Sequence, residues 1–423
     1  MLVHRRRLGA TTVYLINSGA SSLFFGTIFV VNLVYQVEVA HLNPLQLVLV
    51  GTALETVCFF CQVPTGVLAD VYSRRQAVVL GTFLAGAAFV LEGSFPRFDV
   101  ILLSQMIWGL GATLSDGALE AWLAGEVGEE HIGRIFISGE QVGLIGWLFA
   151  AVAGVALGSI RLNLPILVGG SLAMLLAFFL ALFMPERGFQ QASAQERPSW
   201  RALGATLRGG VRDVRSRPVL LAILCIALFY GLWSEGFDRL GTAHFLADFT
   251  FPSLGALKPI VWFGIFTVGS TLLSIIGTEF VKRRLDTSSG RWLIRAQFVL
   301  DALMIVCLVA FGLAGNFFLA LAAYWGVTVF RTISRPLYTT WLTQNTDAKS
   351  RATVLSMSGQ LDALGQIAGG PGVGYIGTVV SLRAALVTAG LMLAPVLPLF
   401  AYAARRSKHM VIVREEDARE VKV

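Results

Sequence analysis

The sequence predicts an all-α membrane protein with about twelve transmembrane helices, and three observations support this prediction. Of the 423 residues, 55% are hydrophobic and only 14% are charged, whereas a soluble domain carries about a quarter charged residues. Apolar stretches of about 20 residues, long enough to cross a bilayer, recur along the chain. The alternating pattern of an outer-membrane barrel strand is not found in the sequence. We therefore expect lipid to surround much of the chain.

Twelve apolar segments define the predicted helices, and one polar stretch divides them into six and six. The polar stretch, residues 186–217, is rich in Gln, Ser and Arg, which is typical of a linker along the cytoplasmic surface. It separates an N-terminal half, 1–185, from a C-terminal half, 218–404, and a charged tail follows at 405–423. The predicted spans are 11–36, 45–70, 76–95, 98–125, 134–160, 162–185, 218–247, 258–282, 291–313, 316–345, 351–380 and 382–404.

Basic residues indicate the orientation of these helices. If both termini are cytoplasmic, most of the 33 Lys and Arg fall in cytoplasmic loops and tails. The basic residues expected on the opposite side are Arg97, Arg161, Lys258 and Arg383. This asymmetry follows the positive-inside rule, so the net charge of +7 requires no nucleic-acid partner. The apolar stretch after Arg7 contains Asn17 and lacks a clear cleavage site, which predicts an uncleaved first helix rather than a secretory signal.

A short motif between the second and third spans connects this chain to a known family. The segment GVLADVYSRR, which begins at Gly66, resembles the signature loop of the major facilitator superfamily, G-x-L-a-D-r-x-G-r-[RK]. In this conformational-gate loop, we expect Gly66 to allow a close approach of helices. Asp70 would pair with basic groups or a helix N-terminus, and Arg74 and Arg75 would anchor the loop in the cytoplasm. Ser73 stands where the family usually has glycine.

Weak internal similarity extends the resemblance to the second half. A degenerate copy of the loop occupies residues 277–284, and the tripeptide AWL at 121–123 matches TWL at 340–342. Such similarity at half the chain length is typical of parallel six-helix repeats. The resemblance implies two six-helix pseudo-repeats that rock around a central cavity, lined by the first, fourth, seventh and tenth helices. It also implies a secondary transporter rather than an enzyme.

Carboxylates within the spans are the candidate proton-coupling residues. Charges in a bilayer are costly and usually mark function, and the candidates here are Asp116, Glu120, Glu235 and Asp238. Asp116 and Glu120 are four positions apart, so on a continuous helix they would share one face. Two carboxyls in a partly dehydrated cavity can exchange protons near neutral pH. The alternative is that Glu120 pairs with an arginine on another helix and stabilises the bundle.

Basic residues within the spans allow two interpretations. Glu235 and Arg239 could form a salt bridge along the seventh helix, which would leave Asp238 free. Arg331 and Arg335 need anions, supplied either by Asp362 on the eleventh span or by an acidic substrate. The sequence also predicts a local helix break at Pro336, and it assigns Glu55 and Asp301 to helix packing. The substrate-cavity candidates, including aromatic residues that could stack on a substrate or anchor the helices, are Asn17, Trp108, Trp233, Arg239, Tyr324, Trp325, Arg331 and Arg335.

The favoured function is proton-coupled efflux of drug-like or amphipathic small molecules by alternating access. The segment QIAGGPGVG at 366–374 resembles the glycine-proline motif of drug antiporters, although that motif normally lies on the fifth helix. Its structural interpretation is a close helix contact. The alternatives are uptake or exchange of a nutrient or organic anion, favoured if Arg331 and Arg335 are unpaired and face the cavity, and a sensor or scaffold without flux.

Cofactors and partners follow from what the sequence lacks. The phosphate-binding pattern G-x-x-x-x-G-K-[ST] is not found, so a proton gradient, and no cofactor, is the expected energy source. The four cysteines, Cys58, Cys61, Cys225 and Cys307, lie in apolar spans without a pattern of metal ligands. We expect no metal site, a small-molecule substrate, a lipid bilayer as the surrounding medium, no nucleic acid, and a monomer in the plasma (inner) membrane.

Overall fold

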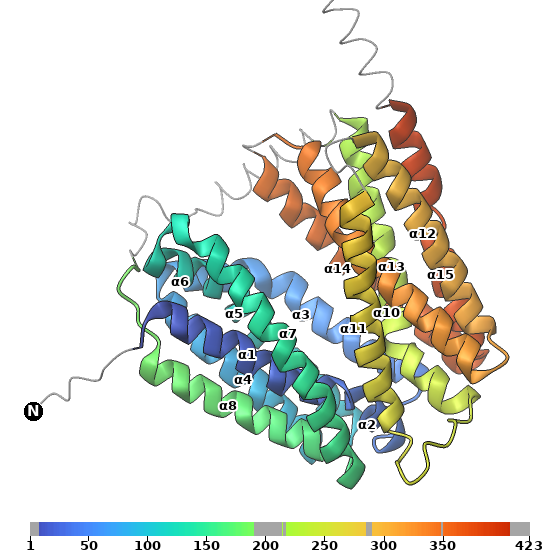
Figure 1. Cartoon of the computed structure of the whole chain (residues 1–423), viewed down its shortest axis with the longest axis horizontal. Helices are drawn as coiled ribbons and strands as arrows, with labels where there is room; N and C mark the ends of the chain where they lie inside the picture. The colour runs from blue at the N-terminus through green and yellow to red at the C-terminus, as the bar shows by residue number, and fades with distance from the viewer. Residues whose placement is uncertain (1–7, 190–213, 215–216, 285–289, 348–349, 407–423) are drawn as a thin grey trace, which may run out of the picture. The chain divides into compact units, whose positions relative to one another are not determined.

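The chain folds into α-helices that group into two compact units (Figure 1). The computed structural model describes residues 8–189, 214, 217–284, 290–347 and 350–406. The first unit contains α1 (Ala10–Phe29), α2 (Asn32–Glu38), α3 (Pro44–Val71), α4 (Arg74–Ser94), α5 (Phe98–Ser115), α6 (Ala118–Val127), α7 (Glu129–Ile160) and α8 (Leu164–Phe183). The second contains α10 (Pro218–Asp248), most of α11 (Val261–Arg284), α12 (Gly290–Leu313), α13 (Phe317–Gln344), α14 (Arg351–Val379) and α15 (Leu382–Leu393).

Eleven of the helical segments in the described ranges are long and apolar enough to cross a membrane. Two of these spans join neighbouring elements, because α1 continues into α2 and α5 continues into α6. Each of the twelve predicted spans has a long helix at its place, but α14 is not among the eleven. The reason is its composition, which includes Asp362 and several Gln, Ser and Gly residues. Such a helix needs protein or water beside it rather than lipid on all sides.

Large apolar side chains remain exposed on several helices. They include Phe149 and Val152 on α7, Phe178 on α8 and Ile276 on α11, each of which is more than half exposed. Exposed apolar surface of this extent is unfavourable in water. It is the expected outer surface of helices that are surrounded by lipid.

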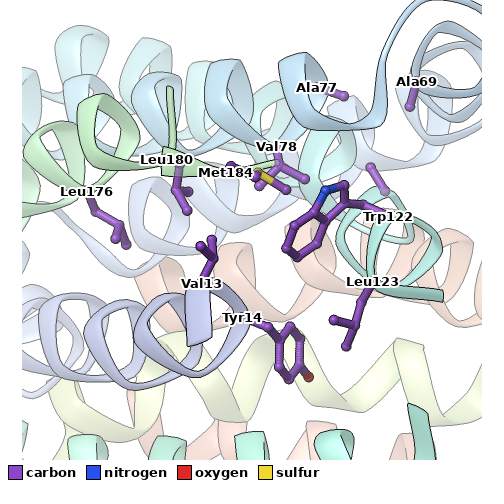
Figure 2. Close-up of a cluster of buried hydrophobic side chains, with 11 residues drawn as sticks. Val13, Tyr14, Ala69, Ala77, Val78, Trp122, Leu123, Leu176, Leu180 and Met184 are labelled. Atoms are coloured by element: carbon purple, nitrogen blue, oxygen red, sulfur yellow. The ribbon is translucent and has the colours of Figure 1, made fainter. Parts of the chain in front are cut away.

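The first unit is built on close contacts between α1 and α7 and between α4 and α8. Small residues allow these contacts: a Cβ atom added at Gly146 would lie 2.6 Å from the carbonyl oxygen of Gly19. An apolar cluster closes one end of the unit, where α1, α3, α4, α6 and α8 meet (Figure 2). At its centre, the indole Nε1 of the fully buried Trp122 donates to the carbonyl oxygen of Pro185 at 2.6 Å. Trp122 therefore has a structural role.

The second unit places α10 against α14 and α15, and α12 against α13 and α15. Gly365 and Gly369 of α14 lie directly on the backbone of α10, because an added Cβ would overlap the carbonyl oxygens of Leu228 and Leu232. A close contact was predicted for the segment that contains Gly369. The predicted helix break at Pro336 is wrong, because α13 is continuous through this residue.

The fourth predicted span is interrupted, contrary to the sequence-based expectation. α5 ends at Ser115 and α6 begins at Ala118, and Gly117 between them has a left-handed backbone with φ of 72°. Glycine adopts this conformation without the steric cost that a Cβ atom imposes. The span therefore turns at Asp116 and Gly117 instead of continuing as one straight helix.

Candidate functional site

A cavity of about 260 Å³ lies within the second unit between α10, α12, α13 and α14. Apolar side chains such as Met304 and Leu355 form part of its wall, and the indole of Trp233 forms another part. Its volume suits a small molecule rather than a polymer. The polar side chains that line it are Tyr230, Arg331, Ser334, Arg335, Tyr338, Thr339, Ser358 and Asp362.

Arg331 enters this cavity from α13 and is held by an ion pair. Its Nη1 lies 2.6 Å from Oδ1 and 2.9 Å from Oδ2 of Asp238 on α10. Its guanidinium carbon also lies 5.2 Å from the centre of the Trp233 ring, within the range of a cation–π contact. The prediction that Asp238 would be free is therefore wrong, because the packing of α10 against α13 brings Arg331 to it.

Arg335 lies one turn further along α13, and its exposed side chain lines the same cavity. In the described part of the chain, its guanidinium forms no ion pair within 4.0 Å. Asp362 on α14 also lines the cavity, attracts both arginines electrostatically, and accepts a hydrogen bond from Gln366 at 2.9 Å. Asp362 was predicted as the ion-pair partner of the arginines, but Arg331 pairs with Asp238 instead.

Glu235 and Arg239 form the predicted salt bridge along one helix. The Arg239 Nε donates to Glu235 Oε1 at 2.8 Å, and the two side chains are only 16% and 5% exposed. Both residues lie on α10, one turn apart, which brings their side chains together. This pair lies beside the cavity but does not line it.

Asp301 is a buried carboxyl group beside the cavity that sequence analysis assigned only to helix packing. It lies near the middle of α12 and is 0% exposed. The Tyr230 hydroxyl donates to its Oδ2 at 2.6 Å, and the Ser334 hydroxyl donates to its Oδ1 at 3.3 Å. Both donors line the cavity. Its mid-span position was the available signal, but only the packing of three helices shows that it adjoins the cavity wall.

Asp116 and Glu120, the other proton-coupling candidates, lie in the first unit. The break at Gly117 separates them, so they do not share one face of a continuous helix as expected. Asp116 caps α5, is exposed, and accepts a hydrogen bond from Gln62 at 3.3 Å. Glu120 is exposed in the first turn of α6. Neither residue is among those that line the cavity of the second unit.

The remaining cavity candidates occupy other places. Asn17 lines a shallow groove of about 360 Å³ on α1 and α7, together with three serines, Glu140 and Trp147. Trp108 packs against Phe29 and Phe89, with ring centres 5.4 Å and 5.1 Å apart. Tyr324 is stacked on Phe237, and Trp325 contacts Gly269. Of the predicted cavity residues, the structure brings Trp233, Arg331 and Arg335 together.

A second buried carboxyl, Glu92 on α4, was not identified from the sequence. It is 0% exposed. Its Oε1 accepts from Gln36 at 2.8 Å and its Oε2 accepts from Gln105 at 2.8 Å. Its backbone carbonyl accepts from the Tyr35 hydroxyl at 2.8 Å. This network joins α2, α4 and α5 inside the first unit.

The signature loop forms a compact set of polar contacts at one end of the first unit. Asp70 Oδ1 lies 3.0 Å from Nη2 of Arg74, and Arg74 Nη1 donates to the carbonyl oxygen of Ala121. The Ser73 hydroxyl donates to Glu186 at 2.7 Å, and Arg75 contacts the same helix end through the Ala181 carbonyl.

The structure also bears on the close helix approach expected at Gly66 and on the question of a metal site. Among the described residues, nothing lies within 4 Å of a Cβ added at Gly66, so the expected close approach of helices at this glycine is not found. Within the same ranges, there is also no group of three or more His, Cys, Asp or Glu residues arranged to hold a metal ion.

Comparison with known proteins gives a family and a fold. The model of the family described as Major Facilitator Superfamily matches residues 14–359. An uncharacterised MFS-type transporter, YxaM of Bacillus subtilis, is 22% identical over 364 residues, covering 85% of this chain and 86% of that protein. A myo-inositol transporter, FST1 of Gibberella moniliformis, is 30% identical over 122 residues, or 28% of this chain and 21% of that protein.

Solved structures of transporters share the fold. The nucleoside transporter NupG has a TM-score of 0.74 and 14% identity, covering 94% of this chain and 99% of that one. A bacterial homologue of the human lysosomal transporter Spinster has a TM-score of 0.73 and 15% identity, covering 94% and 97%. The peptide transporter POT, in complex with sulfate, has a TM-score of 0.69 and 13% identity, covering 95% and 94%.

Proposed function

Because the chain belongs to the major facilitator superfamily of membrane transporters, we propose that it is a proton-coupled secondary transporter that exports an amphipathic, drug-like small molecule. The cavity in the second unit carries this proposal. It combines apolar walls with a tryptophan ring, hydroxyl groups, Arg335 and Asp362. Such a lining suits a substrate with an apolar body and a few polar groups.

Alternating access would require two similar halves, and the packing within the units supports this part of the proposal. In the first unit α1 packs on α7 and α8, and α4 packs on α5 and α8. In the second unit, the helices at the same positions in the order pack alike: α10 on α14 and α15, and α12 on α13 and α15. We propose a six-plus-six repeat on this basis, with both termini in the cytoplasm and a monomer in the plasma membrane.

A second candidate function is uptake or exchange of an organic anion. The observation that favours it is Arg335, which lines the cavity and forms no ion pair among the described residues. A guanidinium group in this position can bind a carboxylate or phosphate with two hydrogen bonds. Two observations oppose it: Arg331 is already paired with Asp238, and a further carboxyl group, Asp362, lines the same cavity.

Transport in proteoliposomes with a pH-sensitive dye inside distinguishes these functions. Two probes are used: ethidium, an aromatic cation with amine donors, and salicylate, an aromatic carboxylate. Ethidium movement against an imposed proton gradient, with matching proton movement, supports drug export. Salicylate movement that is lost in Arg335→Gln and retained in the matched control Arg351→Gln supports the anion function. Arg351 is exposed at the start of α14 and lies outside the cavity. If the protein moves neither probe, the measurement is repeated with a wider panel of cationic, neutral and anionic compounds. Absence of transport for the whole panel would contradict both candidate functions.

A further inference from the structure

Asp301 is a fully buried carboxyl group that reaches the cavity through two hydroxyl groups. Tyr230 comes from α10 and Ser334 from α13, and each donates to a different carboxyl oxygen, at 2.6 Å and 3.3 Å. The two hydroxyl oxygens are themselves 3.4 Å apart. Since both residues also line the cavity, a molecule bound there would be separated from Asp301 only by these two residues.

The elements around Asp301 bring hydroxyl groups to it rather than cations. In the described ranges, no Lys, Arg or His nitrogen lies within 4.0 Å of its carboxylate. On α13, Arg331 precedes Ser334 by three residues and is engaged by Asp238, and Arg335 follows Ser334 and faces the cavity.

Other charged or titratable groups on α12 and on the helices packed against it have partners of their own. On α15 the charged residue is Arg383, in the first turn, 3.5 Å from Asp248. On α12 itself, Arg295 lies over the Trp292 ring. Tyr338 of α13 packs against Tyr230, and its hydroxyl donates to the carbonyl oxygen of Ile223.

These surroundings distinguish Asp301 from the carboxylates on α10. Glu235 and Asp238 each face a guanidinium group at 2.8 Å or less, whereas Asp301 faces two neutral hydroxyl groups. A buried carboxylate without a cation is strongly destabilised, and two neutral hydroxyl donors offset only part of this cost. A protonated carboxyl is neutral and can donate its own hydrogen to a hydroxyl oxygen. The charge of Asp301 therefore depends on how strongly Tyr230 and Ser334 donate to it.

We propose that Asp301 is the proton-binding site of this transporter, and that Tyr230 and Ser334 couple its protonation to the substrate cavity. The inference rests on the proposed function and supplies its coupling site. It differs from the sequence-based candidates, because Asp116 and Glu120 are exposed and the α10 carboxylates are ion-paired.

The direction of coupling follows from the hydrogen bonds. A substrate N–H or O–H that donates to the Tyr230 oxygen polarises the Tyr230 hydroxyl and strengthens its donation to Asp301. This favours the carboxylate, so the proton leaves Asp301 for the water of the cavity when the substrate binds. When a proton returns to Asp301, the Tyr230 oxygen is less able to hold the substrate. Exchange of one for the other is antiport. A substrate that only accepts from Tyr230 would favour protonation instead.

Infrared difference spectroscopy tests the site without knowledge of the substrate. Purified protein in lipid nanodiscs is compared between low and high pH. We expect a C=O stretch of a protonated carboxyl that titrates, is lost in Asp301→Asn, and shifts in frequency in Tyr230→Phe because one hydrogen bond is removed. The matched control Asp99→Asn, at an exposed aspartate beside Arg97, keeps the band. Glu92, the buried carboxyl of the first unit, is unchanged in this variant and can keep a band of its own. A spectrum in which no titrating C=O component is lost in Asp301→Asn overturns the proposal. If Asp301→Asn does not fold, Tyr230→Phe and Ser334→Ala decide, and the absence of any shift in both overturns it.

Flux measurements separate this inference from the proposed function. We expect Asp301→Asn to lose ethidium transport driven by a pH gradient and to retain ethidium exchange at equal pH on both sides. If the wild-type protein moves no probe, the proposed function fails, while the infrared result still decides whether Asp301 binds the proton. If both the wild type and Asp301→Asn move protons with ethidium, the proposed function stands and the role of Asp301 is overturned.

Discussion

The charged side chains of the second unit differ mainly in their partners. Glu235 and Asp238 lie one turn apart on α10, yet one pairs within its own helix and the other pairs across to α13. Asp301 lies near the middle of α12 and is fully buried, but its partners are two hydroxyl groups rather than a cation. In a medium of low dielectric constant, these partners decide whether a carboxyl stays ionised. The same residue type can therefore serve as a structural ion, as Asp238 does, or as a proton carrier, as we propose for Asp301.

The two ion pairs on α10 are expected to differ in their effect on stability. Arg239 and Glu235 are 16% and 5% exposed, whereas Arg331 and Asp238 are 39% and 41% exposed. Removal of one partner from a buried pair costs about 3 kcal/mol, and removal from a solvated pair costs about 1 kcal/mol or less. We expect Arg239→Gln to lower the thermal unfolding midpoint of the purified protein more than Arg331→Gln does. An equal or opposite order of midpoints would contradict this assignment.

At the scale of the helices, glycine positions decide where two backbones meet and where a helix turns. Gly369 allows α14 to lie on the backbone of α10, and Gly117 provides the left-handed turn between α5 and α6. Gly66 has neither role in the described structure. The sequence pattern of a helix does not distinguish these three glycines. They differ in the residues that pack against them and in their backbone conformation, which only the tertiary structure shows.

The contact between α10 and α14 predicts a difference between two alanine substitutions on one helix. An added Cβ at Gly369 would overlap the Leu232 backbone, whereas the described chain leaves open space within 4 Å at Gly372. Both changes raise helix propensity by about 1 kcal/mol, but overpacking against backbone costs about 1–3 kcal/mol. We expect Gly369→Ala to lower the thermal unfolding midpoint and Gly372→Ala to leave it unchanged or higher. Equal midpoints for the two variants would show that α14 can move away from α10 at little cost.

At the scale of the whole molecule, the apolar helices and the family make the chain a multi-pass membrane protein. The distribution of Lys and Arg adds an orientation that can be tested. We expect Arg97→Cys and Lys258→Cys, in a background without the four native cysteines, to react with a membrane-impermeant maleimide on intact cells. Arg134→Cys and Lys282→Cys should react only after permeabilisation. The reverse labelling pattern would mean that the termini lie outside.

Part of the candidate site could be predicted from the sequence. Arg331 and Arg335 were expected at the cavity because charged residues within apolar spans are costly, and Trp233 was expected there because its ring could stack on a substrate. The salt bridge between Glu235 and Arg239 followed from their spacing. The pairing of Asp238 with Arg331 did not, because it joins residues 93 positions apart on different helices.

By itself, the sequence determined the solvent of the chain, the positions of its long helices and its family resemblance, since composition, span length and a local loop motif express these directly. Tertiary structure decided which intramembrane charges are paired, that the fourth span turns at Gly117, and that Asp301 and Glu92 are buried in hydrogen-bond networks. The physical reason is that spacing along one helix fixes neighbours three or four residues apart. The partners of a buried polar group come from other helices, and only packing brings them within hydrogen-bond distance.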